Sequence, residues 1–377
     1  MNILFTRFPL ESRYGGAEVQ TLALMKGLQE KGHTVALLGS CPVLLKEVAG
    51  CGLRVTELDI GNPPVSKASA FSFLWRKFSM KKRLISATCN LQLSHRLDVV
   101  VMLSLSEKLL LTPYLHKQGI KVIWVEHDRV GPWLTHNPWL YTLRRLSRCA
   151  TTIVVSELSK QIYERLGFAN VIAIPNGIDV SRLLDGKKSE KNKVGQEKQK
   201  GAAAFRIGTI ARLSKDKGVD VLIEVVKDLE NVSLTIVGTG PERQCLATQI
   251  RSGRSRSSAT NLQIIDRVDN LHDFYTSLDL FILSSREHDP FGLVAGEAMM
   301  LGIPVIVTDA CGIAGYLTNG RDAVITPCGS VEALRTAILD MKEDPEKFAR
   351  MGAIGKRTAE EKFSMENMVK KYEEMLS

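Results

Sequence analysis

Short runs of β-branched and other apolar residues alternate along the chain with longer segments in which apolar positions recur every three or four residues. The chain opens with an apolar run at 3–7, continues with a helical segment from about Ala17, and returns to an apolar run at 33–38. Further strands are predicted at 53–58, 98–103, 121–126, 152–155 and 171–174. Strands that alternate with helices pair in parallel, so this half predicts one doubly wound α/β domain.

The alternation stops at a polar segment and then starts again. Residues 186–201 hold six lysines, two glutamates and one apolar residue, so they cannot contribute to a core and mark a linker. After the linker, strands are predicted at 205–210, 233–237, 262–265, 280–284, 304–308 and 323–326. We therefore expect two Rossmann-like domains with parallel sheets, at 1–185 and 202–377.

A final amphipathic stretch at 363–376 predicts a helix whose role is packing. Its apolar residues at helical spacing are Phe363, Met365, Met368, Val369, Tyr372 and Met375. The helix, over about 361–377, is in a position to pack back on the first domain.

Length and composition agree with two ordinary globular domains, since the chain has 377 residues and is 44% hydrophobic. The seven cysteines are spread out and form no CxxC pair, which favours a reduced cytoplasmic compartment over a disulfide framework or a zinc site. Residues 1–5 indicate a buried first strand and not a signal peptide. No window holds 18 uninterrupted apolar residues, so a soluble or peripheral protein is expected.

The net charge of +9 favours partners that carry phosphate. One basic cluster, at 76–83, follows the large apolar residues Phe71, Phe73, Leu74 and Trp75. Two interpretations remain for this predicted helix: a solvated face beside a core stripe, or docking on an anionic membrane surface.

Four segments at predicted strand ends are candidates for chemistry. Gly15 and Gly16, between the first strand and the first helix, suit a tight turn with N–H groups facing a ligand, although a plain turn explains them too. The segment lacks the GxGxxG spacing, so NAD binding is disfavoured. Arg212 and Lys217 follow the first strand of the second domain, where a guanidinium and an ammonium suit a diphosphate. A solvated turn is the alternative for that pair.

Gly238 and Gly240 follow the next strand and would let a planar ligand approach the backbone, or serve the turn alone. Arg267, before a later helix, is a candidate contact for the base of a nucleotide.

The strongest segment, 285–299, joins a strand end to a helix. If the helix begins near Phe291 or Gly292, its first N–H groups can hold an anion, and Phe291, Gly292 and Leu293 are candidate donor contacts. Asp289 and Glu297 flank that point, and carboxylates accept hydrogen bonds from sugar hydroxyls.

Taken in order, these segments make the chain resemble the GT-B-fold retaining glycosyltransferases of family four, which combine an E-x7-E motif with an upstream Arg-Lys pair. The matching pieces, spread over nearly the whole chain, are GGAE at 15–18, PNGID at 175–179, GTIARLSKDKG at 208–218, VGTGPE at 237–242, the Asp289–Glu297 pair and EAMMLGIPVIVTD at 297–309. The first acid departs from the pattern, since Asp289 is one methylene shorter than glutamate and Glu287 lies two positions away.

The resemblance implies a GT-B fold with two Rossmann-like domains facing a central cleft, and a nucleotide-sugar bound mainly to the second domain. Arg212 and Lys217 would bind its diphosphate, Glu297 its ribose and Asp289 the transferred sugar. His127, after a first-domain strand, matches the place where similar enzymes put a histidine that hydrogen-bonds the sugar; a structural histidine is the alternative.

The expected activity is metal-independent sugar transfer with retention, from a nucleoside diphosphate sugar with UDP as the default, to a saccharide or a lipid-linked acceptor in cell-surface glycan synthesis. No cofactor is expected, because no DxD stands at a strand end as a metal clamp. The expected location is cytoplasmic, at the inner face of a membrane.

Two other classes compete with this reading. One is a sugar-nucleotide epimerase on the same fold. The other is a non-catalytic nucleotide- or nucleic-acid-binding protein, although the linker lacks aromatic stacking platforms, so nucleic acid is not an expected partner.

Overall fold

The computed structural model describes residues 1–9, 15–94, 96–184, 204–252 and 261–376, and the chain divides into two compact units. Unit 1 comprises Met1–Gly177 with Met365–Ser377, and unit 2 comprises Ile178–Ser364. The predicted linker at 186–201 lies outside the described residues.

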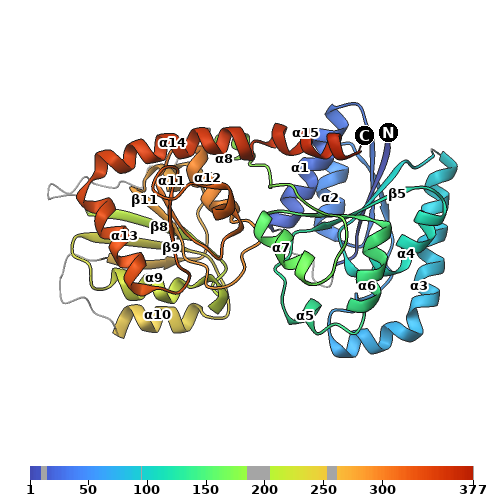
Figure 1. The fold of residues 1–377 in the computed structure, drawn as a ribbon, viewed down its shortest axis with the longest axis horizontal. Coiled ribbons are helices and arrows are strands. Elements are labelled where there is room, and N and C mark those ends of the chain that lie inside the picture. The colour runs from blue at the N-terminus through green and yellow to red at the C-terminus, as the bar shows by residue number, and fades with distance from the viewer. Residues whose placement is uncertain (10–14, 95, 185–203, 253–260, 377) are drawn as a thin grey trace. The chain divides into compact units, whose positions relative to one another are not determined.

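Unit 1 is built on a sheet with helices on both faces (Figure 1). Within the described residues the sheet has seven parallel strands in the order β3-β2-β1-β4-β5-β6-β7. The strands are β1 (Asn2–Arg7), β2 (Thr34–Gly39), β3 (Arg54–Glu57), β4 (Val99–Met102), β5 (Lys121–Glu126), β6 (Thr151–Val154) and β7 (Val171–Ala173). The helices are α1 (Gly16–Glu30), α2 (Pro42–Gly50), α3 (Lys67–Ser94), α4 (Leu105–Lys117), α5 (Pro132–Thr135), α6 (Leu140–Leu146), α7 (Glu157–Arg165) and α15 (Met365–Leu376), with a 3-10 turn at Ser147–Cys149.

Two cores cover the two faces of this sheet, because successive strand residues point to opposite sides. Leu4, Val100 and Val122 pack with α3, α4 and α6, whereas Ile3 and Val99 pack with α1, α2 and α15. Both faces of the sheet are therefore covered by apolar side chains. This explains why strands such as β4 consist of continuous apolar residues and do not alternate with polar ones.

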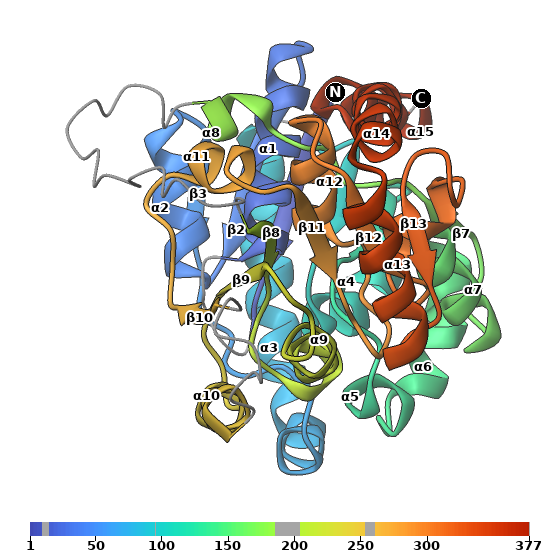
Figure 2. The same cartoon turned by 90° about the vertical axis from the view of Figure 1, so that its left-hand side faces the viewer.

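Unit 2 repeats this architecture, with six parallel strands among its described residues in the order β10-β9-β8-β11-β12-β13 (Figure 2). The strands are β8 (Phe205–Ile210), β9 (Val232–Val237), β10 (Asn261–Ile265), β11 (Leu280–Leu283), β12 (Val305–Thr308) and β13 (Val324–Thr326). The helices are α8 (Val180–Leu184), α9 (Val219–Val226), α10 (Arg243–Ser252), α11 (Leu271–Thr276), α12 (Leu293–Met300), α13 (Val331–Glu343) and α14 (Pro345–Phe363), with 3-10 turns at Lys215–Lys217 and Gly312–Tyr316.

Every predicted strand is confirmed to within one residue at each end, and so is the two-sheet α/β architecture. The predicted helix at 363–376 is interrupted, because Ser364 is extended and separates α14 from α15. The ring of Phe363 packs in unit 2 against Phe291, with 5.3 Å between centroids.

The division between the units differs from the predicted one at residues 178–184, whereas the final helix packs on unit 1, the position considered for it from the sequence. Residues 178–184 pack with unit 2, where Ile178 bonds the carbonyl of Phe363 and α8 contacts α12. Helix α15 belongs to unit 1 and packs on α1, since a Cβ added to Gly27 would lie 2.4 Å from Val369 Cγ2. Tertiary packing, and not the polar linker, therefore sets both limits.

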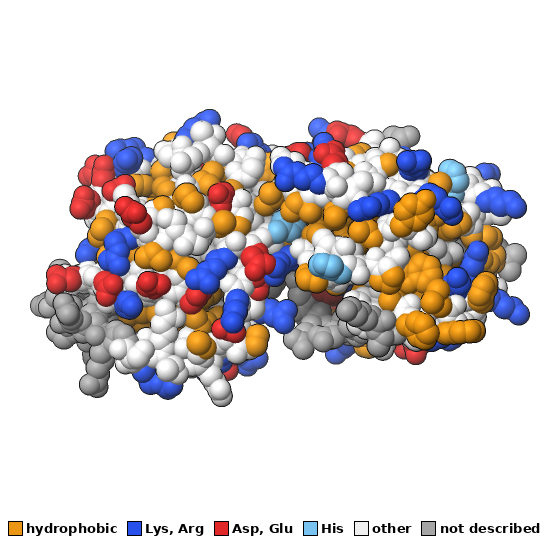
Figure 3. All heavy atoms as spheres, turned by 60° about the horizontal axis from the view of Figure 1, so that its bottom comes forward, with side chains coloured by type: hydrophobic (Ala, Val, Ile, Leu, Met, Phe, Trp, Pro, Cys, Tyr) orange, Lys and Arg blue, Asp and Glu red, His pale blue; other side chains and the backbone are white. Residues whose placement is uncertain are grey.

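The predicted helix of the basic cluster forms as α3, and its surface is mixed in character. Phe73 is buried in the core, whereas Phe71, Trp75 and Phe78 are exposed. Figure 3 shows apolar and basic side chains interleaved over this part of unit 1. Among the described helices, none has both the length and the apolar run needed to cross a bilayer.

Candidate functional site

The loops after two neighbouring strands of unit 2, β8 and β11, bring several of the predicted site residues together at one point of the sheet. Neighbouring strands β8 and β11 lead into connections that leave in opposite directions, and open α/β sheets bind ligands at the carboxyl ends of such strands. The loop after β8 carries Arg212 and Lys217, and the loop after β11 carries Asp289.

Main-chain contacts fix these two loops to each other. The N–H of Arg286 donates to the carbonyl of Asp216 at 2.8 Å. Gly218, with φ of +62°, ends the turn that carries Lys217, and a Cβ there would lie 2.1 Å from the carbonyl oxygen of Ser284. Only glycine fits both the conformation and the space, so the position of Lys217 depends on this residue.

An ion pair joins the loops at the centre of the site. Lys217 Nζ lies 2.7 Å from Asp289 Oδ2, which also accepts a hydrogen bond from Ser285 Oγ at 3.1 Å. The backbone of Asp289 is held on both sides, since its N–H donates to Ala310 at 2.9 Å and its carbonyl accepts from Gly312 at 2.8 Å.

Of the two acids considered from the sequence, the structure brings Asp289, and not Glu287, to Lys217. Asp289 is buried, whereas Glu287 is exposed. The anchored backbone lets the shorter side chain reach the ammonium. Burial and the Asp289 carboxylate also raise the pKa of the adjacent Cys311 thiol to about 11, so this cysteine stays protonated.

The helix that follows, α12, begins one residue beyond Gly292 and carries Glu297. Gly292 adopts φ of +95°, and a Cβ there would lie 2.8 Å from Leu283 Cδ2. The first N–H groups of a helix have no partner within it and attract negative charge, which suits an anion at Leu293. Glu297 Oε2 accepts a hydrogen bond from Tyr275 at 2.7 Å, which orients the carboxylate.

The other predicted donor contacts have mixed surroundings. The Phe291 ring is buried in the core, so only the backbone of this residue is available to a ligand. Gly238 and Gly240 pack on the preceding loop, since added Cβ atoms would lie 1.9 Å from the carbonyl oxygen of Ala211 and 2.3 Å from that of Leu213. Arg212 and Arg267 are exposed. Contact of these residues with a donor stays a prediction.

In unit 1, the sheet edge near the first predicted glycine turn holds a buried ion pair. Gly15 is extended at the start of α1, so its conformation does not require glycine, and Gly16 is the first helical residue. Arg7 Nη2, at the end of β1, lies 2.7 Å from Glu18 Oε1 in the first turn of α1. Arg7 Nη1 also donates to the carbonyl of Leu103 at 3.2 Å.

His127 follows β5 in the same unit, as predicted, and its Nδ1 is enclosed without a hydrogen-bond partner among the described residues. Burial, reinforced by the positive charge of Arg7, lowers the pKa of His127 to about 4. The imidazole is therefore neutral at pH 7 and able to donate or accept a hydrogen bond with an uncharged hydroxyl. A role beside a donor sugar stays a prediction.

Several residues around these sites were not predicted from the sequence. In unit 1 they are Arg7 and Lys108, whose Nζ lies 2.8 Å from Glu126 Oε1 and 3.2 Å from the carbonyl of Val125. In unit 2 they are Ser285 and Tyr275. Only Lys108 gave a signal, since it stands in the apolar run LSEKLLL and a buried lysine requires a partner.

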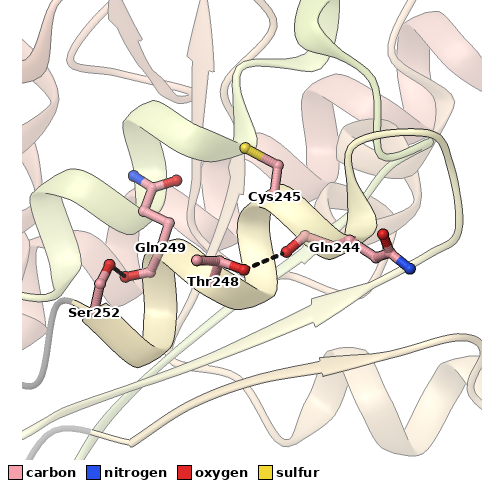
Figure 4. Close-up of a pocket in the computed structure, with 5 residues that line it drawn as sticks. All are labelled: Gln244, Cys245, Thr248, Gln249 and Ser252. Carbon is pink, nitrogen blue, oxygen red and sulfur yellow. Dashed lines mark hydrogen bonds between the residues drawn. The ribbon is translucent and has the colours of Figure 1, made fainter.

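A surface depression elsewhere in unit 2 does not resemble a substrate site (Figure 4). It is lined by Gln244, Cys245, Thr248, Gln249 and Ser252, which all lie on α10. Thr248 and Ser252 hydroxyls donate to carbonyls of their own helix, at 3.0 and 3.3 Å. Within the described part of the chain, no three His, Cys, Asp or Glu side chains converge as metal ligands would.

Two family sequence models match successive parts of the chain. Residues 14–182 match Glycosyltransferase Family 4, and residues 190–358 match Glycosyl transferases group 1. Between them the two models leave little of the chain unmatched.

Curated relatives match smaller parts. The lipopolysaccharide core biosynthesis glycosyltransferase LpsD of Rhizobium meliloti is 34% identical over 44% of this chain and 47% of its own length. The capsular polysaccharide biosynthesis glycosyltransferase CapM of Staphylococcus aureus is 28% identical over 63% of this chain and 64% of its own. The chain thus aligns with about half to two thirds of the length of these relatives.

Solved structures share the fold over the full chain. Anabaena HepE in complex with UDP superposes with a TM-score of 0.78, at 20% identity, over 100% of this chain and 99% of its own. A HepE complex with UDP-glucose gives 0.75. With two parallel-sheet units, the ordered motifs and both family matches, the chain belongs to the family-four glycosyltransferases of the GT-B fold.

Proposed function

We propose that this protein transfers a sugar from a UDP-sugar to a saccharide or lipid-linked acceptor in cell-surface glycan synthesis, in the cytoplasm at the inner face of a membrane. The observation that carries the proposal is the Lys217–Asp289 ion pair at the carboxyl ends of β8 and β11. Relatives named for lipopolysaccharide and capsule synthesis support the product class, and the UDP complex of HepE supports the nucleotide.

In the proposed reaction, Lys217 and Arg212 bind the diphosphate. The bond between sugar C1 and the phosphate oxygen breaks, and its electron pair stays on that oxygen, where the two cations stabilise the developing charge. The acceptor oxygen forms its bond to C1 on the same face of the sugar, and its proton passes to the departing phosphate. The anomeric configuration is thereby retained, and no metal takes part.

The ion pair fits this role because it holds the cation ready. Without a donor, the ammonium of Lys217 is paired with Asp289, and the lysine side chain stays about one-fifth exposed. A diphosphate carries more charge than one carboxylate and competes for the ammonium, while Asp289 keeps the hydroxyl of Ser285 as a partner. Glu297, oriented by Tyr275, would accept the ribose hydroxyls.

The test is thermal stabilisation by UDP, GDP, ADP, their sugar conjugates and NAD. A nucleotide at about 100 times its dissociation constant adds about 2.7 kcal/mol to stability. We expect stabilisation by the UDP series in the wild type and in Lys215→Ala, an exposed lysine of the same turn, and none in Arg212→Ala/Lys217→Ala. No response to any nucleotide in the wild type would contradict the proposed donor site.

Two further measurements distinguish the proposed reaction from a metal-dependent transfer and from epimerisation of the donor. Transfer should run at full rate with excess chelator and give a product with the anomeric configuration of the donor, read by NMR. Loss of activity on chelation would contradict the metal-free scheme. Conversion of the donor into an epimer without an acceptor would indicate a sugar-nucleotide epimerase.

A further inference from the structure

Helix α3 exposes a second apolar stripe that the core of unit 1 does not use. Phe71, Leu74, Trp75 and Phe78 follow the spacing i, i+3, i+4, i+7 and are 67%, 43%, 79% and 74% exposed. Ala70, Phe73, Met80 and Leu84 form the buried stripe of the same helix. A surface helix needs one apolar face, and a second one marks an interaction site.

Basic residues continue the exposed stripe along the same face. Lys81 and Lys82 stand three and four residues after Phe78, and both are exposed. The ammonium of Lys77 lies 5.2 Å from the centre of the Phe78 ring and 5.5 Å from that of Trp139. Residues 60–97 contain no aspartate or glutamate, so the helix carries positive charge without compensation from its own segment.

Helix α6 extends this face. Tyr141 is 74% exposed, Arg144 and Arg145 are exposed, and residues 129–156 again contain no acid. The segment before α6 is fixed to α3, because the Phe73 and Trp139 rings meet edge to face at 5.2 Å. We define the α3–α6 surface as the exposed apolar and basic residues of the two helices: Phe71, Leu74, Trp75, Phe78, Lys81, Lys82, Tyr141, Arg144 and Arg145.

We propose that the α3–α6 surface docks unit 1 on an anionic lipid bilayer. Aromatic rings favour the boundary between headgroups and acyl chains, and lysine and arginine next to them bind lipid phosphates. A second copy of the chain is a poorer occupant, because a twofold contact through this patch would oppose one basic surface to another. Docking would hold the protein beside a lipid-linked acceptor, and so extends the proposed function.

The experiment is co-sedimentation with vesicles of phosphatidylcholine alone and of phosphatidylcholine with 30% phosphatidylglycerol, without any sugar donor. We expect the wild type to bind only the anionic vesicles. Lys81→Ala/Lys82→Ala should lower the partition coefficient about thirtyfold, since each basic residue near the surface contributes about fivefold. Trp75→Ala/Phe78→Ala should lower it at least about tenfold through loss of apolar burial.

The matched control is Lys26→Ala/Lys46→Ala, which removes two exposed lysines from α1 and α2 of the same unit and should bind like the wild type. Absence of wild-type binding, or an equal loss in the control, would overturn the proposal. A wild-type dimer in light scattering that becomes a monomer in Trp75→Ala/Phe78→Ala would also overturn the proposal. Because no donor is present, failure here leaves the nucleotide experiment unaffected, and the reverse holds too.

Discussion

The two units place ion pairs at the same edge of similar sheets, yet the pairs differ in how completely they are enclosed. In unit 1, the Lys108 and Glu126 side chains are 3% and 11% exposed, and Lys108 also bonds a backbone carbonyl. In unit 2, the Lys217 side chain is 21% exposed, and its ammonium pairs with the carboxylate of Asp289.

The difference separates a structural charge from one that can exchange partners. A deeply buried pair contributes little net stability but costs much when one member is removed, because the other stays buried without compensation. A partly exposed lysine can pass from one anion to another at lower cost. On this comparison the charges of unit 1 build a framework, and Lys217 is the cation suited to a ligand.

The sharpest test of this comparison is Lys108→Met in unit 1. It should lower the unfolding free energy of unit 1 by about 3–5 kcal/mol, because Glu126 loses its cation. The four tryptophans, Trp75, Trp124, Trp133 and Trp139, all lie in unit 1, so their fluorescence during urea unfolding reports that unit alone. The exposed Lys117→Met is the control, and equal stability of both variants would contradict the structural role.

In unit 2, Asp289→Asn should change activity more than stability. We expect turnover to fall about 10- to 100-fold, since the amide positions Lys217 less well. Glu287→Gln, two residues away and exposed, should stay close to wild type. A covalent sugar adduct in the intact mass of Asp289→Asn would instead show a carboxylate nucleophile and contradict same-face transfer.

The pH dependence of unit 1 should carry the signature of His127. Its pKa is about 4 in the folded chain and 6.5 in the unfolded chain, so between these values only the unfolded chain binds the proton. Stability is therefore lost as pH falls from 6.5 towards 4, by about 2 kcal/mol at pH 5. His127→Gln should remove that contribution when tryptophan fluorescence is followed from pH 7 to 5.

A second group acts in the opposite direction over the same range, so the variant must be compared with the wild type. Burial raises the pKa of Glu107 to about 7, which makes the folded chain hold the extra proton between 4.5 and 7 and lose stability as pH rises. An unchanged pH slope in His127→Gln would show that the imidazole is not shielded as described.

The smallest effect is expected for Tyr275→Phe in unit 2. Loss of the hydrogen bond to Glu297 should raise the KM for the donor about threefold, with kcat nearly unchanged. Tyr372→Phe, at a buried tyrosine on α15, is the control. A fall in kcat without a change in KM would place Glu297 in the chemical step.

The strands were predictable because burial on both faces leaves an unmistakable pattern, as in Val99–Met102 and Val305–Thr308. The break at Ser364 was not predictable, because the apolar residues on either side of it keep helical spacing. Only tertiary packing decides that α14 joins unit 2 and α15 joins unit 1. The limit at Gly177 was missed for the same reason, since the contacts of Ile178 are made with residues far along the chain.

In the site, Lys217 and Asp289 were predictable because each follows a predicted strand, and parallel strands bring their carboxyl ends to the same edge of the sheet. Arg7 with Glu18 and Lys108 with Glu126 were not paired from the sequence, because their members lie 11 and 18 residues apart on different elements. No local pattern encodes such a pair. The choice between Asp289 and Glu287 likewise needed the backbone bonds to Ala310 and Gly312.

Helix α15 also decides when unit 1 can be finished during synthesis. Its residues Met368, Val369 and Tyr372 are part of the core beneath β1 and α1, but the ribosome makes them only after the whole of unit 2. Unit 1, which emerges first, therefore keeps part of the core on the α1 side of its sheet exposed until α15 is made, whereas unit 2 can already fold. A nascent chain stalled before Met365 is the species most in need of a chaperone.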